Sequence, residues 1–322
     1  MEGIKITKKP RLRDPQLIVA WPGMGEVAFK AASFLVEQFK AQEFAEIPSQ
    51  EFFYLTGSVV QKGILSVPEL PQNKFYYWKN PAGRHDLIIF ISNAQPDLVK
   101  ATEYCNRIIE VARLFKAKTV VSFAAMPQPV DHTQSANVWF ASTSDEINQH
   151  LKKFNLSVLS DGQISGMNGL FLGLAKKSGL DGFCLLGEIP LYTIQIENPK
   201  ASQAVLEALS KILEIKLDYL ALVEQTHRME DEINKLLDYL KVGPSVAAPI
   251  GEEEIEKIKK YLSQVTKLPV SVKENIEKLF SEARTDISKA HELKTKLDKW
   301  NVYKEYEDRF LDLFKKQPGK SN

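Results

Sequence analysis

The sequence predicts an α/β fold, with a mixed, mainly parallel sheet flanked by helices and a helical C-terminal extension. Two observations lead to this prediction. Short apolar runs rich in β-forming residues alternate with glycine- or proline-containing turns and with segments whose apolar residues recur at three- and four-residue steps. Beyond residue 253 these strand-like runs cease and charged residues become denser. The alternation is typical of a sheet covered by helices on both faces.

The first unit, residues 16–40, sets the pattern. Residues 17–21 (LIVAW) suit a strand buried on both faces, and residues 27–39 have helical spacing. The joint Gly23-Met24-Gly25-Glu26-Val27-Ala28 matches the G-x-G-x-x-G/A pattern of turns that bring the backbone close to a pyrophosphate. A purely structural interpretation fits equally, because the glycines permit a tight turn and alanine allows close packing of helix on strand.

The middle of the chain repeats this alternation. Strand-like runs in 45–68 and the aromatic run 75–78 are closely spaced, which predicts antiparallel hairpins at one side of the sheet. The next unit has a strand at 86–92, a polar turn at 93–97 and a helix through 99–114, followed by a strand at 119–123 and a long polar loop at 124–137. A strand at 138–141 and a helix at 145–154 come next. The last unit has a strand from 157, a glycine-rich joint at 162–169, a helix at 170–177 and a strand at 182–187.

The period changes in residues 201–240. Apolar residues from Ile212 to Leu240, interrupted by Thr226, step alternately by three and four, which predicts one long helix that pairs with another helix. Two prolines and two glycines in the segment that follows are typical of a linker. We therefore divide the chain into an α/β domain, residues 1–240, and a linker with a helical extension, residues 241–322. Helices are expected in the extension at 253–264, from a capping box at 271–274 to 297, and at 303–314.

The composition is that of an ordinary globular protein, with 44% hydrophobic and 26% charged residues. A net charge of +1 gives no electrostatic basis for binding nucleic acid or an anionic membrane. No apolar run is long enough to cross a bilayer, and the first residues lack the apolar core of a signal peptide, so a cytoplasmic location is expected. Cys105 and Cys184 lie in apolar segments and are expected to be reduced and buried. Neither they nor the five histidines show a metal-ligand spacing, so no metal or other cofactor is expected.

Four segments together resemble one family: WPGMGEVA at 21–28, NAQPD at 93–97, DGQISGMNGL at 161–170 and LLGEIPLY at 185–192. In this order, over roughly residues 10–240, the chain is similar to the archaeal and bacterial homologues of the second proteasome-assembly chaperone. The resemblance implies a phosphorylase/hydrolase-like topology, homo-oligomers and a long helical C-terminal extension. Some members dock a C-terminal hydrophobic–tyrosine–any-residue motif into the proteasome α-ring. This chain ends Lys320-Ser321-Asn322, so docking by that route is not expected.

Candidate ligand-binding residues follow from the expected strand ends, because open α/β sheets gather ligands at the carboxyl ends of their strands. If the loops there converge, they form a polar cleft suited to a small hydroxylated or anionic ligand. His132 has the chemistry of a general acid or base. Alternatively, these side chains satisfy backbone groups at turns and caps. The candidates are Gly23, Gly25, Glu26, Asn93, Gln95, His132 and Asn168.

Two functions therefore stay open. The first is a non-enzymatic, homo-oligomeric assembly chaperone or interaction protein, with proteasome subunits as candidate partners, which associates through the seam 212–240 and the charged helices after 253. The second is a binding protein or enzyme for a nucleoside- or nucleotide-like molecule, an idea that rests on analogy of fold alone. No nucleophile elbow, Walker lysine or paired-carboxylate motif is present, so no catalytic residue is assigned and the first function is favoured.

Overall fold

The structure is a computed structural model that describes residues 3–242, 270–299 and 303–314. Most of the predicted linker and the predicted helix 253–264 lie outside the described residues. None of the helices within these ranges combines the length and the apolarity that crossing a membrane requires.

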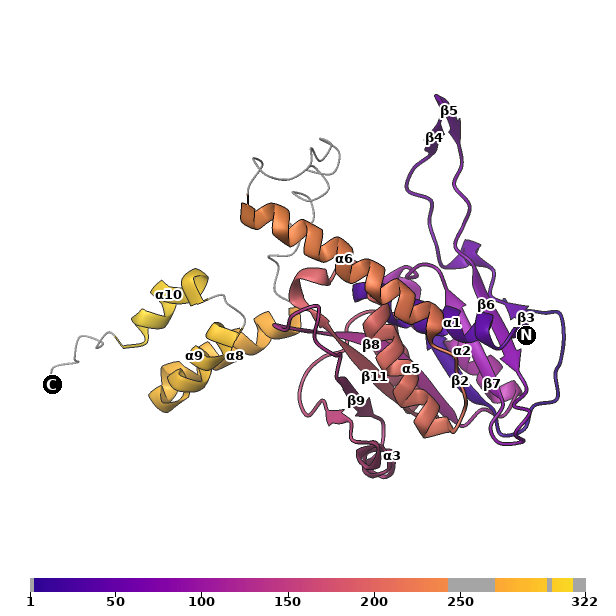
Figure 1. The fold of residues 1–322 in the computed structure, drawn as a ribbon. Coiled ribbons are helices and arrows are strands. Elements are labelled where there is room, and N and C mark those ends of the chain that lie inside the picture. Colours follow the sequence, from indigo (N-terminus) through magenta and orange to yellow (C-terminus); the bar gives the residue numbers. More distant parts are fainter. Residues whose placement is uncertain (1–2, 243–269, 300–302, 315–322) are drawn as a thin grey trace.

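A mixed sheet forms the centre of the molecule (Figure 1). Its four middle strands, β7, β2, β8 and β11, run parallel, and antiparallel pairing brings β6 and β3 to one side and β9 to the other. The predicted fold class is thus confirmed. Across the sheet the strands are β1 (Lys5–Ile6), β3 (Gln42–Glu46), β6 (Asn73–Trp78), β7 (Leu87–Ser92), β2 (Gln16–Ala20), β8 (Thr119–Gln128), β11 (Asp181–Pro190), β9 (Val138–Ser142) and β10 (Ser157–Val158).

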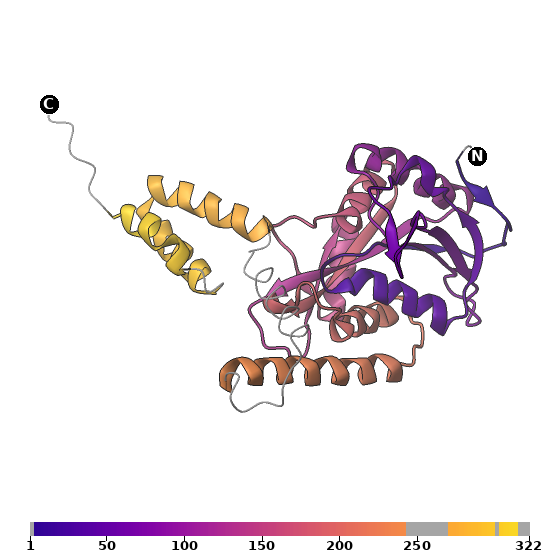
Figure 2. The ribbon, with the colours of Figure 1, turned by 90° about the horizontal axis from the view of Figure 1, so that it is seen from above.

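Helices cover both faces of the sheet, as Figure 2 shows from above. On one face lie α2 (Ala101–Leu114) and α4 (Met167–Lys177), and on the other lie α1 (Val27–Gln38) and α5 (Pro199–Leu213), while α3 (Asp145–Leu151) follows β9. Strand β2 serves both faces because successive side chains of a strand point in opposite directions: Leu17 and Val19 join one core, and Ile18 joins the other.

Strands β8 and β11 are longer than predicted. They pair in parallel over ten positions, from Thr119 opposite Asp181 to Gln128 opposite Pro190. The predicted loop 124–137 is therefore wrong over its first five residues, whose sequence AAMPQ has little strand propensity of its own. Pairing of β8 with β2 ends at Ser122, so beyond this residue, as far as Gln128 and including Pro127, β8 pairs with β11 and not with β2.

The long helix predicted over 201–240 is wrong, because the chain breaks it after Leu213. Glu214 adopts a left-handed conformation (φ 52°) that ends α5, and the chain turns back before α6 (Leu220–Val242). Helix α5 packs on the sheet and α6 packs on α5. Leu222, Met229 and Ile233 on α6 are buried within the chain, and Leu222 joins the core to which α5 contributes, so this part of the predicted seam packs inside the same chain.

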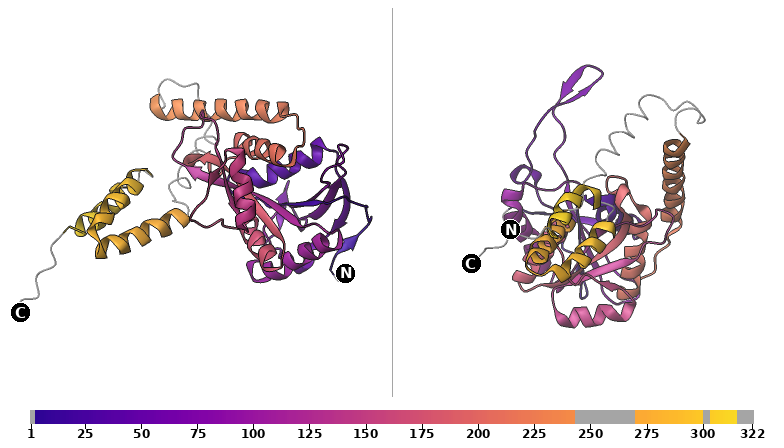
Figure 3. Two further views of the ribbon diagram at one scale, coloured as in Figure 1. Left: turned by 90° about the horizontal axis from the view of Figure 1, so that it is seen from below. Right: turned by 90° about the vertical axis from the view of Figure 1, so that its left-hand side faces the viewer.

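The C-terminal helices α8 (Val270–Thr285), α9 (Ala290–Lys299) and α10 (Tyr303–Asp312) have an apolar core of their own. Figures 2 and 3 show them to one side of the sheet, where Leu191 packs against that core. The single helix predicted from 271 to 297 is wrong: Asp286 has an extended conformation and its side chain accepts a hydrogen bond from Ser288 N, which starts a new helical turn.

A β-hairpin stands out from the α/β domain on the side of β6, as Figure 1 shows and the right-hand view of Figure 3 confirms. It consists of β4 (Val59–Gln61) and β5 (Ile64–Ser66). The strand-like runs predicted in 45–68 thus split between β3, which ends at Glu46, and this separate hairpin.

Candidate functional site

The glycine joint after β2 is fixed to the segment that precedes α5. Gly25 has a left-handed conformation (φ 61°), as has Glu26 (φ 51°). Gly25 N donates to the carbonyl of Ile194 at 2.8 Å, and Asn198 N donates to the carbonyl of Gly25 at 2.8 Å. A Cβ added at Gly25 would lie 3.3 Å from Asn198 Cβ. Both the conformation and the space therefore favour glycine here.

Replacing Gly25 by valine is expected to lower the free energy of unfolding by about 2–4 kcal/mol, because a β-branched residue is strained in a left-handed conformation and lacks space. Urea unfolding measures the loss. Gly57→Val is the matched control, since an added Cβ there meets nothing within 4 Å. Equal stability of the two variants would show that the joint tolerates a side chain.

Asn168 ties α4 to the end of β2. Its side chain is 4% exposed; Oδ1 accepts from Trp21 N at 3.0 Å, and Nδ2 donates to Trp21 O at 3.0 Å. The amide thus replaces the strand partner that β2 lacks at this position.

Gln95 acts in a similar way beside it. Nε2 donates to the carbonyl of Pro22 at 2.6 Å, and Oε1 accepts from Met167 N at 3.0 Å. Gly23 lies against Asn168, since a Cβ on this glycine would be 3.6 Å from Nδ2. The structure therefore brings Gly23, Gln95 and Asn168 together, with both amides hydrogen-bonded to backbone groups.

Asn93 and His132 belong to other hydrogen-bonded groups. Asn93 Oδ1 accepts from Gln72 N at 2.8 Å, on the side of β6. His132 is 3% exposed; its Nδ1 lies 2.8 Å from Tyr192 Oη, and its Nε2 lies 2.9 Å from Asn234 Oδ1 on α6. The seven candidates thus divide among three places, and a ligand at any of them stays a prediction.

His132 belongs to a polar cluster that holds α6 in place. Lys200 on α5 donates to the carbonyls of His132 (2.6 Å) and Gln134 (3.2 Å) and forms an ion pair with Glu230 on α6. No local pattern links His132 to this cluster, because its partners Tyr192, Lys200 and Asn234 lie 60 to 102 positions away on other elements. Glu230 joins through Lys200.

Replacing His132 by alanine is expected to lower the free energy of unfolding by about 1–3 kcal/mol, because the Tyr192 hydroxyl and the Asn234 amide each lose a partner. Amide hydrogen exchange should speed up selectively in α6. Lys235→Ala is the control, because that lysine also lies on α6, next to Asn234, but is exposed. Unchanged exchange in α6 would mean that the cluster does not hold the helix.

The titratable groups give no indication of an activated nucleophile. Burial raises the pKa of the Cys105 and Cys184 thiols to about 12 each, so both are neutral at pH 7, and both are free and buried as predicted. Burial, then the nearby Glu197 carboxylate, raises the pKa of Glu26. Within the described ranges, no three or more His, Cys, Asp or Glu side chains are grouped to hold a metal ion.

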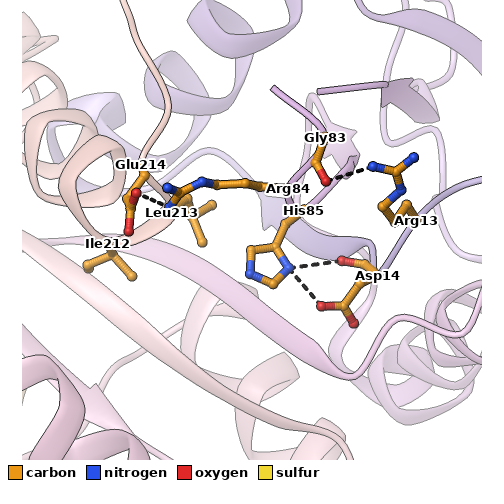
Figure 4. A pocket seen from close by; sticks show the side chains of 8 residues that line it. All are labelled: Arg13, Asp14, Gly83, Arg84, His85, Ile212, Leu213 and Glu214. Carbon is orange, nitrogen blue, oxygen red and sulfur yellow. Dashed lines mark hydrogen bonds and ion pairs between the residues drawn. The ribbon is translucent and has the colours of Figure 1, made fainter. Parts of the chain in front are cut away.

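A pocket of about 380 Å³ lies at the other end of the sheet, next to the amino ends of β2 and β7 (Figure 4). Its charged side chains are engaged with one another or with backbone: Arg84 pairs with Glu214, His85 Nδ1 lies 2.8 Å from Asp14, and Arg13 donates to the carbonyl of Gly83 at 2.8 Å. This pocket lies away from the predicted edge and contains none of the seven candidates.

The fold is similar to those of two solved archaeal structures. PbaB of Pyrococcus furiosus, described as an archaeal proteasome activator, superposes with a TM-score of 0.63 and 29% identity over 72% of this chain and 97% of its own. PbaA of the same organism, an archaeal homologue of proteasome-assembly chaperone, gives a TM-score of 0.58 and 22% identity over 83% of this chain and 100% of its own.

The sequence comparisons identify the family of the chain. The uncharacterised protein MJ1210 of Methanocaldococcus jannaschii is 29% identical over 262 residues, which are 79% of this chain and 97% of that protein. The model of the PAC2 family matches residues 17–237. The chain belongs to the PAC2 family, and the resemblance seen in its sequence is confirmed.

Proposed function

We propose that the chain is a non-enzymatic, homo-oligomeric assembly chaperone or interaction protein whose partners are proteasome subunits. The observation that carries this proposal is the likeness to PbaB, an archaeal proteasome activator, at 29% identity over 97% of that chain. A cytoplasmic location belongs to the proposal, as does the division into an α/β domain, residues 1–240, and an extension, residues 241–322.

The geometry of the sheet edge supports a role without catalysis. At this edge an α/β enzyme usually positions its reacting groups. Here Asn168 and Gln95 bind the backbone of Trp21, Pro22 and Met167, and His132 is buried under α6. These hydrogen bonds support a structural role for the three side chains.

The test is sedimentation of the purified full chain with proteasome particles, and with isolated α-subunits, from its own host. The proposal expects saturable co-sedimentation and a changed rate of particle assembly. The control is an unrelated α/β protein of similar mass at the same concentration. Absence of co-sedimentation together with an unchanged assembly rate would refute a proteasome role.

A nucleotide-like ligand is a second candidate, favoured by one observation. Helices α1 and α4 both begin at the edge where Gly23, Gln95 and Asn168 meet, and helix N-termini favour anions. Nucleosides and nucleotides that raise the midpoint of thermal unfolding in the unaltered chain, but not in Gln95→Ala, would support this site. No shift with any of them would remove it.

A further inference from the structure

The hairpin and its two connecting segments, residues 54–68, form an arm that exposes apolar side chains. Val60 is 61% exposed, Ile64 72%, Leu65 69% and Val67 72%. Lys62 is the arm's one charged residue. Clusters of exposed apolar side chains of this kind mark interaction surfaces.

The arm has little to stabilise it alone. Each strand has three residues, joined by a two-residue turn, Lys62-Gly63, in which both φ angles are positive. In the part of the chain that the structure describes, β4 and β5 pair only with each other, so both outer edges have free backbone groups. Isolated two-stranded hairpins are at best marginally stable in water. A partner that covers the arm would supply the missing contacts.

The base of the arm is also apolar. Asp97 N donates to the carbonyl of Phe52 at 2.9 Å, which places the 3-10 turn Leu98–Lys100, just before α2, next to the segment that leads into the arm. There Leu98 is 76% exposed and Val99 is 91% exposed, and Leu55 at the foot of the arm is 46% exposed. The arm therefore has one exposed apolar surface at its tip and another at its base.

Charges are distributed in a complementary way. The tip has a basic residue, Lys62, whereas the base has three acidic residues, Glu51, Glu69 and Asp97, and one basic residue, Lys100. Two arms related by a two-fold axis perpendicular to their length run antiparallel, so each tip meets the base of the other arm. Opposite charges and apolar surfaces then come together twice, as an interface between identical surfaces requires.

We infer that the arm packs against the arm of a second copy of this chain, antiparallel and tip to base. This inference rests on the homo-oligomer of the proposed function and names the surface that forms it. Register shows which face makes the contact. Val60 lies opposite Leu65, and Val67 continues that face, whereas Ile64 lies on the other face opposite Gln61. The continuous apolar face, Val60, Leu65 and Val67, is the contact face.

Neighbouring residues provide a matched pair of variants. Leu65→Glu introduces a charge into the contact face, whereas Ile64→Glu introduces it at similar exposure on the opposite face. Light scattering over a concentration series should show a dimer dissociation constant raised about tenfold or more for Leu65→Glu and changed less than threefold for Ile64→Glu. Equal effects of the two variants, or no effect of either, would overturn the assignment of this face.

Disulfide trapping tests the tip-to-base arrangement. Lys62→Cys and Glu69→Cys are made in separate chains and mixed under mild oxidation, so a bond between positions 62 and 69 must join two copies. The native Cys105 and Cys184 are buried and give little background. A covalent dimer is expected from the mixture, and none from Lys62→Cys mixed with Lys118→Cys, an exposed position before β8. The absence of the 62–69 dimer would overturn the arrangement.

The two proposals fail in different ways. A monomeric chain that still binds proteasome particles would overturn the arm interface and leave the proteasome role intact. An arm-linked dimer that binds no proteasome subunit would support the interface and refute that role.

Discussion

Replacing Gly169 by alanine is expected to lower the free energy of unfolding by more than about 3 kcal/mol, the largest effect of any single methyl group considered for this chain. A Cβ at this position would lie 2.0 Å from the carbonyl oxygen of Ile164, which is backbone and cannot move aside alone. Helix α4 would have to shift away from the joint that precedes it, and the bonds of Asn168 to Trp21 would break with it.

Gly173 supplies a matched control on the same helix, one turn later. An added Cβ there meets nothing within 4 Å, so Gly173→Ala should raise stability by about 0.5–1 kcal/mol through helix propensity. Both variants replace glycine by alanine in the same helix, so the gain in helix propensity is the same. The difference between their free energies of unfolding, measured with urea, therefore reports the clash with Ile164. A Gly169→Ala variant as stable as Gly173→Ala would refute the close approach of α4 to Ile164.

Replacing Asn168 by alanine is expected to cost about 2–4 kcal/mol of unfolding free energy. The change leaves both the N–H and the carbonyl of Trp21 without partners in a buried place, and each unsatisfied backbone group costs about 1–3 kcal/mol. Asn93→Ala is the control, because that amide also accepts a backbone hydrogen bond but lies in an exposed position. Its loss should be below about 1 kcal/mol.

Asn168→Asp refines this test. It keeps an acceptor for Trp21 N but places a carboxylate oxygen against the carbonyl of Trp21, so it should destabilise the chain more at pH 7 than at pH 4, where the acid can donate. Equal stability of Asn168→Ala and the unaltered chain would contradict a structural role and favour a free amide that awaits a ligand.

The strand-and-helix order was predictable because local signals and tertiary packing agree. Residues 17–21 are apolar and β-rich, and β2 occupies the middle of the sheet, buried on both faces. Residues 124–128 gave no such signal, and they are a strand only because β11 pairs with them. The break at Glu214 was also hidden, because the apolar spacing continues across it while the backbone reverses.

The candidate site was predictable in part. Gln95 and Asn168 satisfy backbone groups, as the structural alternative predicted, but those groups belong to Trp21, Pro22 and Met167 on distant segments and not to local turns or caps. The partners of His132 could not be predicted from neighbouring residues. Tyr192 and Asn234 contact it only in the folded chain, where β11, α5 and α6 bring them to the loop that contains His132. The exposure of the arm could not be predicted either, because residues 59–67 have the sequence pattern of ordinary strands.

The apolar spacing of residues 212–240 suggests testing association between copies with a charged residue on α6, but the structure argues against that test. Ile233 is 4% exposed and faces its own chain, so a charge there would dislodge α6 and would not report on contacts between copies. The arm is the surface to alter when association is at issue.

Native mass spectrometry of the full chain, purified from its own host without added ligand, tests the central proposal most directly. An assembly chaperone is expected to appear as a homo-oligomer, with a fraction bound to proteasome subunits and no stoichiometric small molecule. A monomer that carries one nucleotide-like molecule per chain would contradict this account and transfer the function to the edge formed by Gly23, Gln95 and Asn168.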